Sequence, residues 1–145
     1  MRQVVDDSGQ SLSLPSHPSR IVSLTYGTDE ILLGLVDTSR VTALSRYAGN
    51  PDISFVTEEE AEAVGRKVDM NAESIMALKP DLVIVSTAVS PQLVSLLRQS
   101  GIPVYVSLVA VSFDEMEEKV RGVARAVNEE AGGEAMVQDM ENKKA

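Results

Sequence analysis

Cysteine is absent from the 145 residues, tryptophan is absent too, and histidine occurs once. The chain therefore forms no disulfide and offers no thiolate ligand to a metal. The single histidine, His17, lies in a connector between Pro15 and Pro18. We expect it to be structural or exposed to solvent, because one imidazole cannot build a metal cluster.

Long apolar segments are also lacking. The sequence has neither a basic-then-apolar leader nor a run of about 18 apolar residues, the length needed to cross a bilayer. Nothing in these residues by itself directs export or spans a membrane. If the protein is exported, we expect its signal to have been removed.

The common catalytic motifs are missing. The sequence contains no G-x-S-x-G, no G-x-x-x-x-G-K-[ST] and no G-x-G-x-x-G, the signatures of many hydrolases, phosphate-binding loops and dinucleotide sites. Carboxylates cluster at Glu58 to Glu60 and at Glu117 and Glu118, but within charged helical runs, where we expect solvated faces rather than acid–base pairs. An enzyme is not predicted.

Positive charge is in short supply. There are 22 acidic against 13 basic side chains, which gives a formal net charge of −9. Sequence-independent binding of nucleic acid depends on neutralising phosphates with lysine and arginine, so this class of partner is excluded. A partner with basic docking residues fits the charge. Length and the 43% hydrophobic content indicate one globular domain with a real core.

The apolar pattern predicts an α/β fold. The first fourteen residues alternate around Gly9, as in a β-hairpin, and four later apolar runs have strand character: residues 21–24, 41–44, 82–85 and 104–106. Helical patterns separate these runs, which is typical of a parallel sheet. We expect a single Rossmann-like lobe, with a mainly parallel sheet flanked by helices.

Local signals predict where the helices begin and end. We expect caps at Thr28, Asn71 and Ser90, a capping box of Ser112 with Glu115, and a helix end at Gly101. From Ser112 the chain is expected to be helical to its end, with a bend or break near Gly132 and Gly133, because glycine disfavours helix by about 1 kcal/mol relative to alanine.

Four loops follow strands or precede a helix at one predicted edge of the sheet. In an open parallel sheet, ligands collect at the carboxyl ends of the strands, beside helix N-termini. Tyrosine offers a flat apolar face, glycine allows close approach, and cations attract an anionic ligand. The predicted ligand contacts are Tyr26, Gly27, Thr28, Arg46, Tyr47, Arg66, Lys67 and Thr87. The alternative is that Thr28 and Asn71 are only caps and that Arg66 and Lys67 are a solvated loop.

An ordered set of segments resembles the N-terminal lobe of class III periplasmic binding proteins, which feed iron-siderophore, haem and cobalamin importers. The segments are Leu14-Pro15, RIVSL from Arg20, TDEIL from Thr28, Val64-Gly65, Asn71-Ala72-Glu73, LKPDLV from Leu78 and GIPV from Gly101. The resemblance covers nearly the whole chain. Each segment alone is weak, but their combination in this order is specific.

The resemblance implies a two-lobed protein that holds its ligand between the lobes. Residues 1–131 would form the N-terminal lobe, and residues 132–145 the beginning of the helix that links it to a second lobe absent from this chain. Such proteins deliver the ligand to the membrane permease of an ABC importer. In the family, an acidic residue of each lobe pairs with permease arginines, and the matching residue here is Glu73.

The resemblance also implies the kind of ligand and the location. Because histidine is nearly absent, we expect a chelated metal rather than a bare ion, with no separate cofactor and no metal ligands from the protein. Ferric siderophore or haem ranks above cobalamin, since Arg46, Arg66 and Lys67 suit anionic oxygens. The location implied is extracytoplasmic, in the periplasm or held by a lipid anchor, with membrane contact only through that anchor or the permease.

A competing interpretation is a single-lobe α/β interaction or signalling module, such as a receiver-like domain, that never closes on a ligand. A receiver needs an acidic cluster at the strand ends with a lysine opposite. The strands here end in Ser-Leu-Thr, Leu-Ser-Arg and Val-Ser-Thr, which supply no such cluster. The binding-protein interpretation is therefore preferred.

Overall fold

A five-stranded parallel sheet forms the centre of the molecule, in the order β5-β4-β3-β6-β7. The structure is a computed structural model that describes residues 1–144, with side chains through residue 143. A separate antiparallel hairpin precedes the sheet, as predicted. The strands are β1 (Arg2–Val5), β2 (Ser11–Leu14), β3 (Ile21–Ser23), β4 (Val41–Ser45), β5 (Lys67–Val68), β6 (Leu82–Ser86) and β7 (Val104–Ser107). The four predicted sheet strands are confirmed; β5, two residues long, was not predicted.

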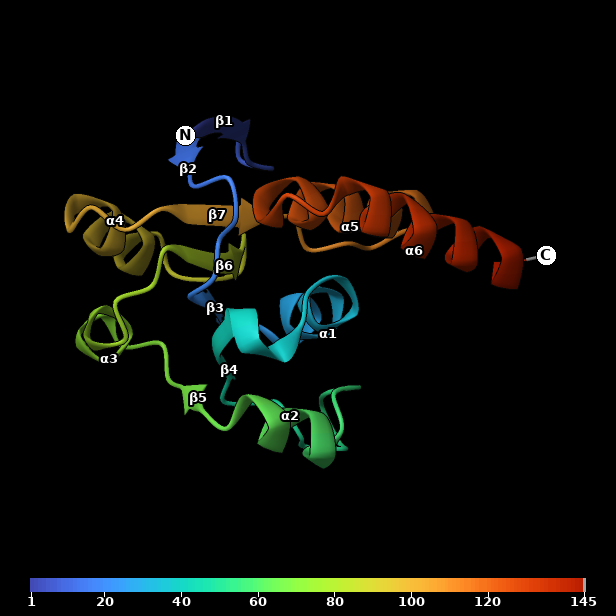
Figure 1. Cartoon of the computed structure of the whole chain (residues 1–145), viewed down its shortest axis with the longest axis horizontal. Helices are drawn as coiled ribbons and strands as arrows, with labels where there is room; N and C mark the ends of the chain where they lie inside the picture. The colour runs from blue at the N-terminus through green and yellow to red at the C-terminus, as the bar shows by residue number, and fades with distance from the viewer. Residues whose placement is uncertain (145) are drawn as a thin grey trace.

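Helices cover both faces of the sheet (Figure 1). They are α1 (Tyr26–Leu35), the 3₁₀ turn η1 (Thr38–Arg40), α2 (Glu58–Val64), α3 (Ala72–Ala77), α4 (Pro91–Gln99), α5 (Phe113–Val127) and α6 (Glu130–Lys144). Helices α3 and α4 lie on one face, while α1, α2, α5 and α6 lie on the other, with the hairpin beside β7 at one end of the sheet. No helix among residues 1–144 is long and apolar enough to cross a membrane.

The core has two layers because strand residues alternate between the faces of the sheet. Ile21 and Ile84 point toward α1 and α5, whereas Val22 and Val83 point toward α3 and α4, and all four are fully buried. Both faces are covered by helices, so the strands are continuous apolar runs rather than alternating ones. This is why the sequence pattern predicted them well.

Two of the predicted helix starts need correction. Helix α1 begins earlier than predicted, with Thr25 as its cap, and Thr28 is buried in the first turn, where its hydroxyl lies 2.6 Å from the Ser23 hydroxyl. Ser112 caps α5, but Glu115 accepts from the Val111 N–H and so does not close the predicted capping box.

Other helix ends match the prediction. Asn71 caps α3 by accepting from the Ser74 N–H, and Gly101, with φ +84°, follows the end of α4. Ser90 precedes α4, but its side chain makes no capping hydrogen bond. A complete capping box occurs at α2, between Thr57 and Glu60, and was not predicted.

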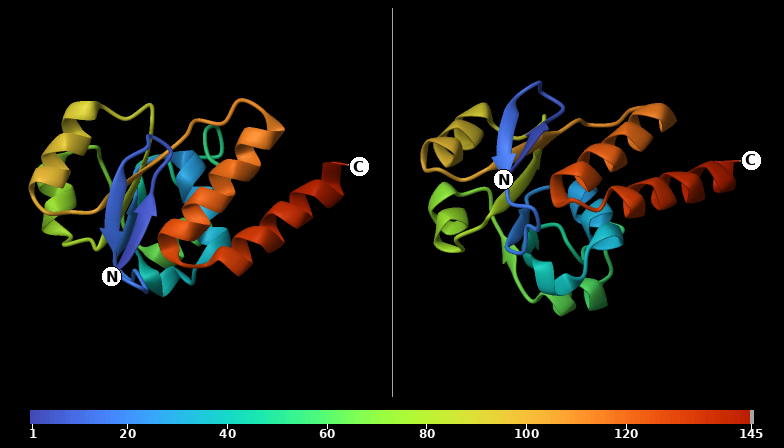
Figure 2. Two further views of the ribbon diagram at one scale, coloured as in Figure 1. Left: turned by 90° about the horizontal axis from the view of Figure 1, so that it is seen from above. Right: turned by 45° about the horizontal axis from the view of Figure 1, so that its top comes forward.

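The predicted break near Gly132 and Gly133 is wrong. The chain breaks at Asn128, whose φ of 59° is left-handed, and α6 then runs through both glycines. A β-carbon on Gly133 would lie 2.4 Å from that of Ala124, so the glycine lets α5 and α6 approach closely. Figure 2 shows these helices side by side as a hairpin, with α6 extending away from the body. The predicted boundary between residues 131 and 132 falls inside α6.

Candidate functional site

A cavity of about 500 Å³ opens at the carboxyl edge of the sheet. The segment that follows every one of the five strands helps to line it, because parallel strands end on the same side. Its walls come from Tyr26 and Gly27 after β3, Tyr47 after β4, Met70 after β5, Ala88 after β6 and Val109 after β7, and α5 adds Met116 and Lys119. The volume and the largely apolar lining are those of a small-molecule site.

Two tyrosines form one wall of this cavity. The rings of Tyr26 and Tyr47 meet edge to face, with centroids 6.0 Å apart and an angle of 86°. Arg46 lies over the Tyr47 ring at 5.0 Å and donates to its hydroxyl at 2.9 Å, which raises the pKa of the guanidinium. The contact between cation and ring fixes Tyr47 while leaving Arg46 exposed. Thus Tyr26, Gly27 and Tyr47 come together as predicted, with Arg46 beside them.

Lys119 also lines this cavity, and the sequence analysis did not predict it. It is only 4% exposed, lines the cavity, and donates from Nζ to the Ser107 hydroxyl at 3.0 Å and to the Leu108 carbonyl. Burial lowers the pKa of its ammonium to about 8, and the negative charge of Asp7 acts in the opposite direction. The sequence did contain a signal, since Lys119 follows Met116 by three residues and so shares its side of α5.

Asp29 lies beneath the site as a buried carboxylate. It accepts from the Ser45 N–H at 3.0 Å and from the Ser45 hydroxyl at 2.5 Å, and so ties α1 to the end of β4. Loss of solvation raises the pKa of Asp29 to about 6, although the bonds to Ser45 oppose the rise. The neighbouring Thr28 is likewise fully buried, so its side chain does not line the cavity.

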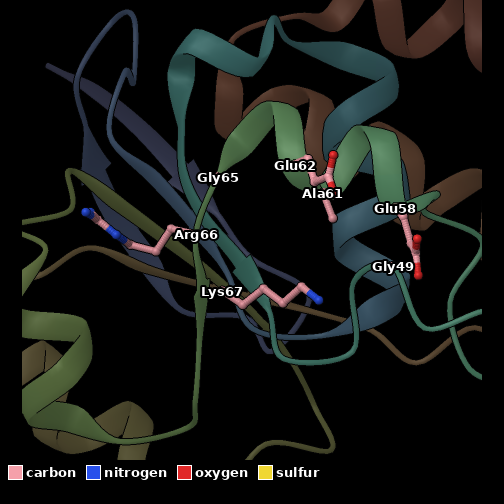
Figure 3. Close-up of a pocket in the computed structure, with 7 residues that line it drawn as sticks. All are labelled: Gly49, Glu58, Ala61, Glu62, Gly65, Arg66 and Lys67. Carbon is pink, nitrogen blue, oxygen red and sulfur yellow. The ribbon is translucent and has the colours of Figure 1, made fainter.

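Three other predicted contacts lie elsewhere. Arg66 and Lys67 line a separate cavity of about 620 Å³ beside α2, together with Gly49, Glu58 and Glu62. Figure 3 shows the side chains of Arg66 and Lys67 pointing in opposite directions. The structure does not bring these two cations into the cavity with the tyrosines.

Thr87 is exposed and lines a third cavity of about 540 Å³, between the hairpin turn and α4. Glu73 is exposed in the first turn of α3, as a docking residue requires. Glu117, expected to be solvated, is instead 8% exposed, and the neighbouring Glu141 carboxyl raises the pKa of the Glu117 carboxyl. Among residues 1–143, no three histidine, cysteine or acidic side chains gather to hold a metal.

Known proteins resemble this chain in sequence. A protein called cobalamin-binding protein, from Halobacterium salinarum, is 26% identical over 140 residues, which is 97% of this chain and 37% of the relative. A vitamin B12-binding protein from Vibrio cholerae is 30% identical over 86% of this chain and 44% of the relative. A probable siderophore-binding lipoprotein from Bacillus subtilis is 27% identical over 98% and 43%. The chain spans less than half the length of these curated relatives.

Solved structures share the fold. The molybdate periplasmic binding protein of Haemophilus influenzae matches with a TM-score of 0.75 and 18% identity, over 95% of this chain and half of that one. A periplasmic heme binding protein from Pseudomonas aeruginosa matches with a TM-score of 0.70 and 18% identity, over 86% and 44%. At these identities the likeness establishes the architecture alone.

The family is established by a wider match. The model of the periplasmic binding protein family matches residues 21–145, which include the whole parallel sheet and the helices around it. The match agrees with the resemblance found in the sequence and does not favour a signalling module. Family members are binding proteins rather than enzymes. With its ligand-sized cavity at the carboxyl edge of the sheet, this chain belongs to the periplasmic binding protein family.

Proposed function

We propose that this chain is the N-terminal lobe of the solute-binding component of an ABC importer, and that the cavity between Tyr26, Tyr47 and Lys119 is its half of the ligand site. The observation that carries the proposal is the convergence of all five strand ends on one largely apolar cavity. A receiver-like module would need an acidic cluster at this edge, and the lining of the cavity contains no aspartate or glutamate among the described residues. Its open side would face the second lobe, and α6 would begin the linking helix.

The proposed ligand is a metal chelate, with a ferric siderophore or haem ranked above cobalamin. Relatives named for cobalamin, vitamin B12, a siderophore and heme support the class as a whole. The flat tyrosine wall suits the face of a large ring or the apolar part of a chelate. The metal would arrive already bound within the ligand, so no separate cofactor is proposed.

The proposed partner is the importer's membrane permease. Glu73 is exposed, stands on a short helix and belongs to a chain of net charge −9, all of which suit contact with permease arginines. We place the protein outside the cytoplasmic membrane, as the family and its lipoprotein relatives support. Its contact with the membrane would come through the permease or a lipid anchor.

An amide NMR titration of the 145-residue chain tests the proposal. The probes are a ferric hydroxamate, a ferric catecholate, haem and cyanocobalamin, each added up to millimolar concentration, because half a site binds weakly. Binding at the cavity is expected to perturb the amides of Tyr26, Gly27 and Tyr47. The amides of Arg66, Lys67 and Thr87 serve as internal controls, because they line the other two cavities.

Perturbations that cluster at the three cavity residues with one probe would support the proposal and name the cargo. Perturbations centred on Arg66 and Lys67 would move the ligand site to the cavity beside α2. An absence of change with all four probes would contradict the assignment of this cavity as a site for metal chelates.

A further inference from the structure

We propose that Lys119 and the first turn of α1 form an anion subsite at the base of the cavity, which selects ligands that carry a carboxylate on an apolar body. This inference rests on the proposed function and narrows its ligand class. It would favour haem, through its propionates, or a carboxylate siderophore over a corrin whose side chains are neutral amides.

The positive charge of Lys119 lies in an unusual, buried position. Lysine is rarely buried without a charged partner, since removing an ammonium from water is costly. Lys119 is 96% removed from solvent, and the cavity it lines is otherwise formed by tyrosines, methionines, small residues and backbone. A lone cation within an apolar site gives the site a preference for negative charge.

The hydrogen bonds of the Lys119 ammonium do not use all of its donors. An ammonium group has three N–H donors, and the Lys119 Nζ has two acceptors among the described residues, Ser107 and Leu108. Neither acceptor is charged. One donor and the full positive charge are therefore left for a ligand. The acidic side chain that favours the charged form of Lys119 is Asp7 in the hairpin turn, whose carboxylate already accepts from the Leu108 N–H at 2.8 Å.

The first turn of helix α1 lines the same cavity as Lys119. Helix α1 has ten residues, and its first turn leaves N–H groups without partners inside the helix. Thr25 accepts from the N–H groups of Thr28 and Asp29, whereas Tyr26 and Gly27 line the cavity. The positive end of the helix dipole and the ammonium therefore act on the same space.

Gly27 lies beside the side chain of Lys119. A β-carbon at this position would lie 3.7 Å from the Lys119 Cε, which is ordinary contact. Gly27 and the stem of Lys119 therefore lie beside each other on the cavity wall, and the glycine has no side chain to cover its backbone there. A carboxylate entering there would accept from Nζ and from the backbone of the turn.

The test compares ligands with and without carboxylates in the 145-residue chain. One pair is haem and haem dimethyl ester, which have the same porphyrin ring and differ in whether the carboxylates are free. The other pair is ferric citrate, a carboxylate chelate, and ferrioxamine B, a hydroxamate chelate. The variants are Lys119→Met, which keeps the length of the side chain, and Lys67→Met as a matched control from the cavity beside α2. Affinities come from NMR titration, and the ε-methylene resonance of Lys119 reports its protonation.

We expect the wild-type chain to bind a carboxylate ligand at least tenfold more tightly than its partner in the pair. Lys119→Met should abolish this preference, and Lys67→Met should retain it. In the wild-type chain, the Lys119 resonance should titrate near pH 8 when free and at higher pH with the carboxylate ligand bound, because the anion favours the ammonium. A lysine with only a structural role would not show that shift.

The two pairs also show which scaffold carries the carboxylate. A preference for haem over its ester would indicate a ring ligand, and a preference for ferric citrate over ferrioxamine B would indicate a carboxylate siderophore. Binding that ignores the carboxylate, or an unmoved Lys119 titration in the bound wild-type chain, would overturn the subsite and leave the proposed function standing. Failure of all four ligands to bind would overturn both. The wild-type titration needs no variant, so the result does not depend on the folding of Lys119→Met.

Discussion

The buried carboxyl group of Asp29 makes the stability of the fold depend on pH. In the unfolded chain an aspartate titrates near pH 4, whereas burial raises the pKa of Asp29 in the folded protein to about 6. The folded state therefore binds the proton more tightly. The contribution of this group to stability is fully present below about pH 4 and is lost as the pH rises toward 6.

Asp29→Asn is expected to remove this pH dependence. The amide keeps an oxygen for the Ser45 N–H and places its NH₂ beside the Ser45 hydroxyl, which can accept. Two units of pKa correspond to about 3 kcal/mol, so the wild-type free energy of unfolding should fall by up to that amount between pH 4 and 6, relative to the variant. Urea unfolding at several pH values measures the difference.

The exposed Asp52 provides a control for that experiment, because Asp52→Asn removes the same charge from the surface. Its unfolding curve should follow the wild-type pH dependence. A wild-type decline that persists unchanged in Asp29→Asn would show that the buried carboxylate is not its source.

Tyr47 should contribute to ligand binding through its ring. Tyr47→Ala removes the edge-to-face partner of Tyr26 and the surface beneath Arg46. An aromatic contact contributes about 0.5–1.5 kcal/mol beyond area burial, so affinity for the chelate that binds best should fall about tenfold in an NMR titration. The fold should survive, because Tyr47 is only half-buried. Phe55→Ala, at an exposed loop position, should bind like the wild type, and equal affinity of Tyr47→Ala would remove the tyrosine wall from the site.

At the scale of whole elements, the adjacent glycines of α6 have different roles. A β-carbon on Gly132 would make only ordinary contacts, with Leu35 at 3.6 Å and Glu129 at 4.0 Å, whereas one on Gly133 would overlap Ala124 at 2.4 Å. Gly132→Ala should therefore stabilise the protein by up to about 1 kcal/mol, because alanine favours helix. Gly133→Ala should destabilise it by about 1–3 kcal/mol through overpacking between α5 and α6.

Thermal and urea unfolding of the two variants measure this difference, with each glycine serving as the control for the other. Equal stabilisation by both substitutions would show that α6 does not pack closely on α5. Opposite signs would support the close approach that holds the helical hairpin together.

These glycines also show why the elements were predictable only in part. The strands were found because burial on both faces makes them continuous apolar runs, a property of the sequence itself. Helix propensity alone predicts a break at the glycines. In the structure, the close contact between Gly133 and Ala124 favours glycine inside α6, so the break lies elsewhere. Asn128, which tolerates the left-handed conformation, makes the turn instead.

At the scale of the molecule, the sequence predicts the edge of the sheet where the cavity opens, but it does not resolve which residues line it. The rule that ligands collect at the carboxyl ends of strands predicted Tyr26, Gly27 and Tyr47. The rule does not place Arg66 and Lys67 in a separate cavity, because their directions depend on where β5 begins, and that strand is too short to leave a sequence pattern. Lys119 comes from a helix far along the chain, so only the packing of α5 reveals it.

The proposed function makes the surface charge of the whole molecule a test of docking. Glu73 lies on α3, outside the cavity lined by Tyr26 and Lys119, so ligand capture and docking should be separable. Glu73→Gln, in the importer whose binding protein carries this lobe, should leave ligand affinity unchanged. It should reduce uptake several-fold, because an exposed carboxylate paired with arginine acts mainly on association and is screened by salt.

Glu59→Gln serves as the matched control, since Glu59 is also an exposed glutamate in the first turn of a helix. Both variants change the net charge from −9 to −8, as loss of one acidic side chain requires. If general attraction by the acidic surface drives docking, the two variants should lose uptake equally. If Glu73 meets a specific arginine, only Glu73→Gln should be impaired. Raising the salt concentration should then reduce wild-type uptake toward the uptake of Glu73→Gln. Normal uptake by Glu73→Gln at low salt would remove Glu73 from the docking surface.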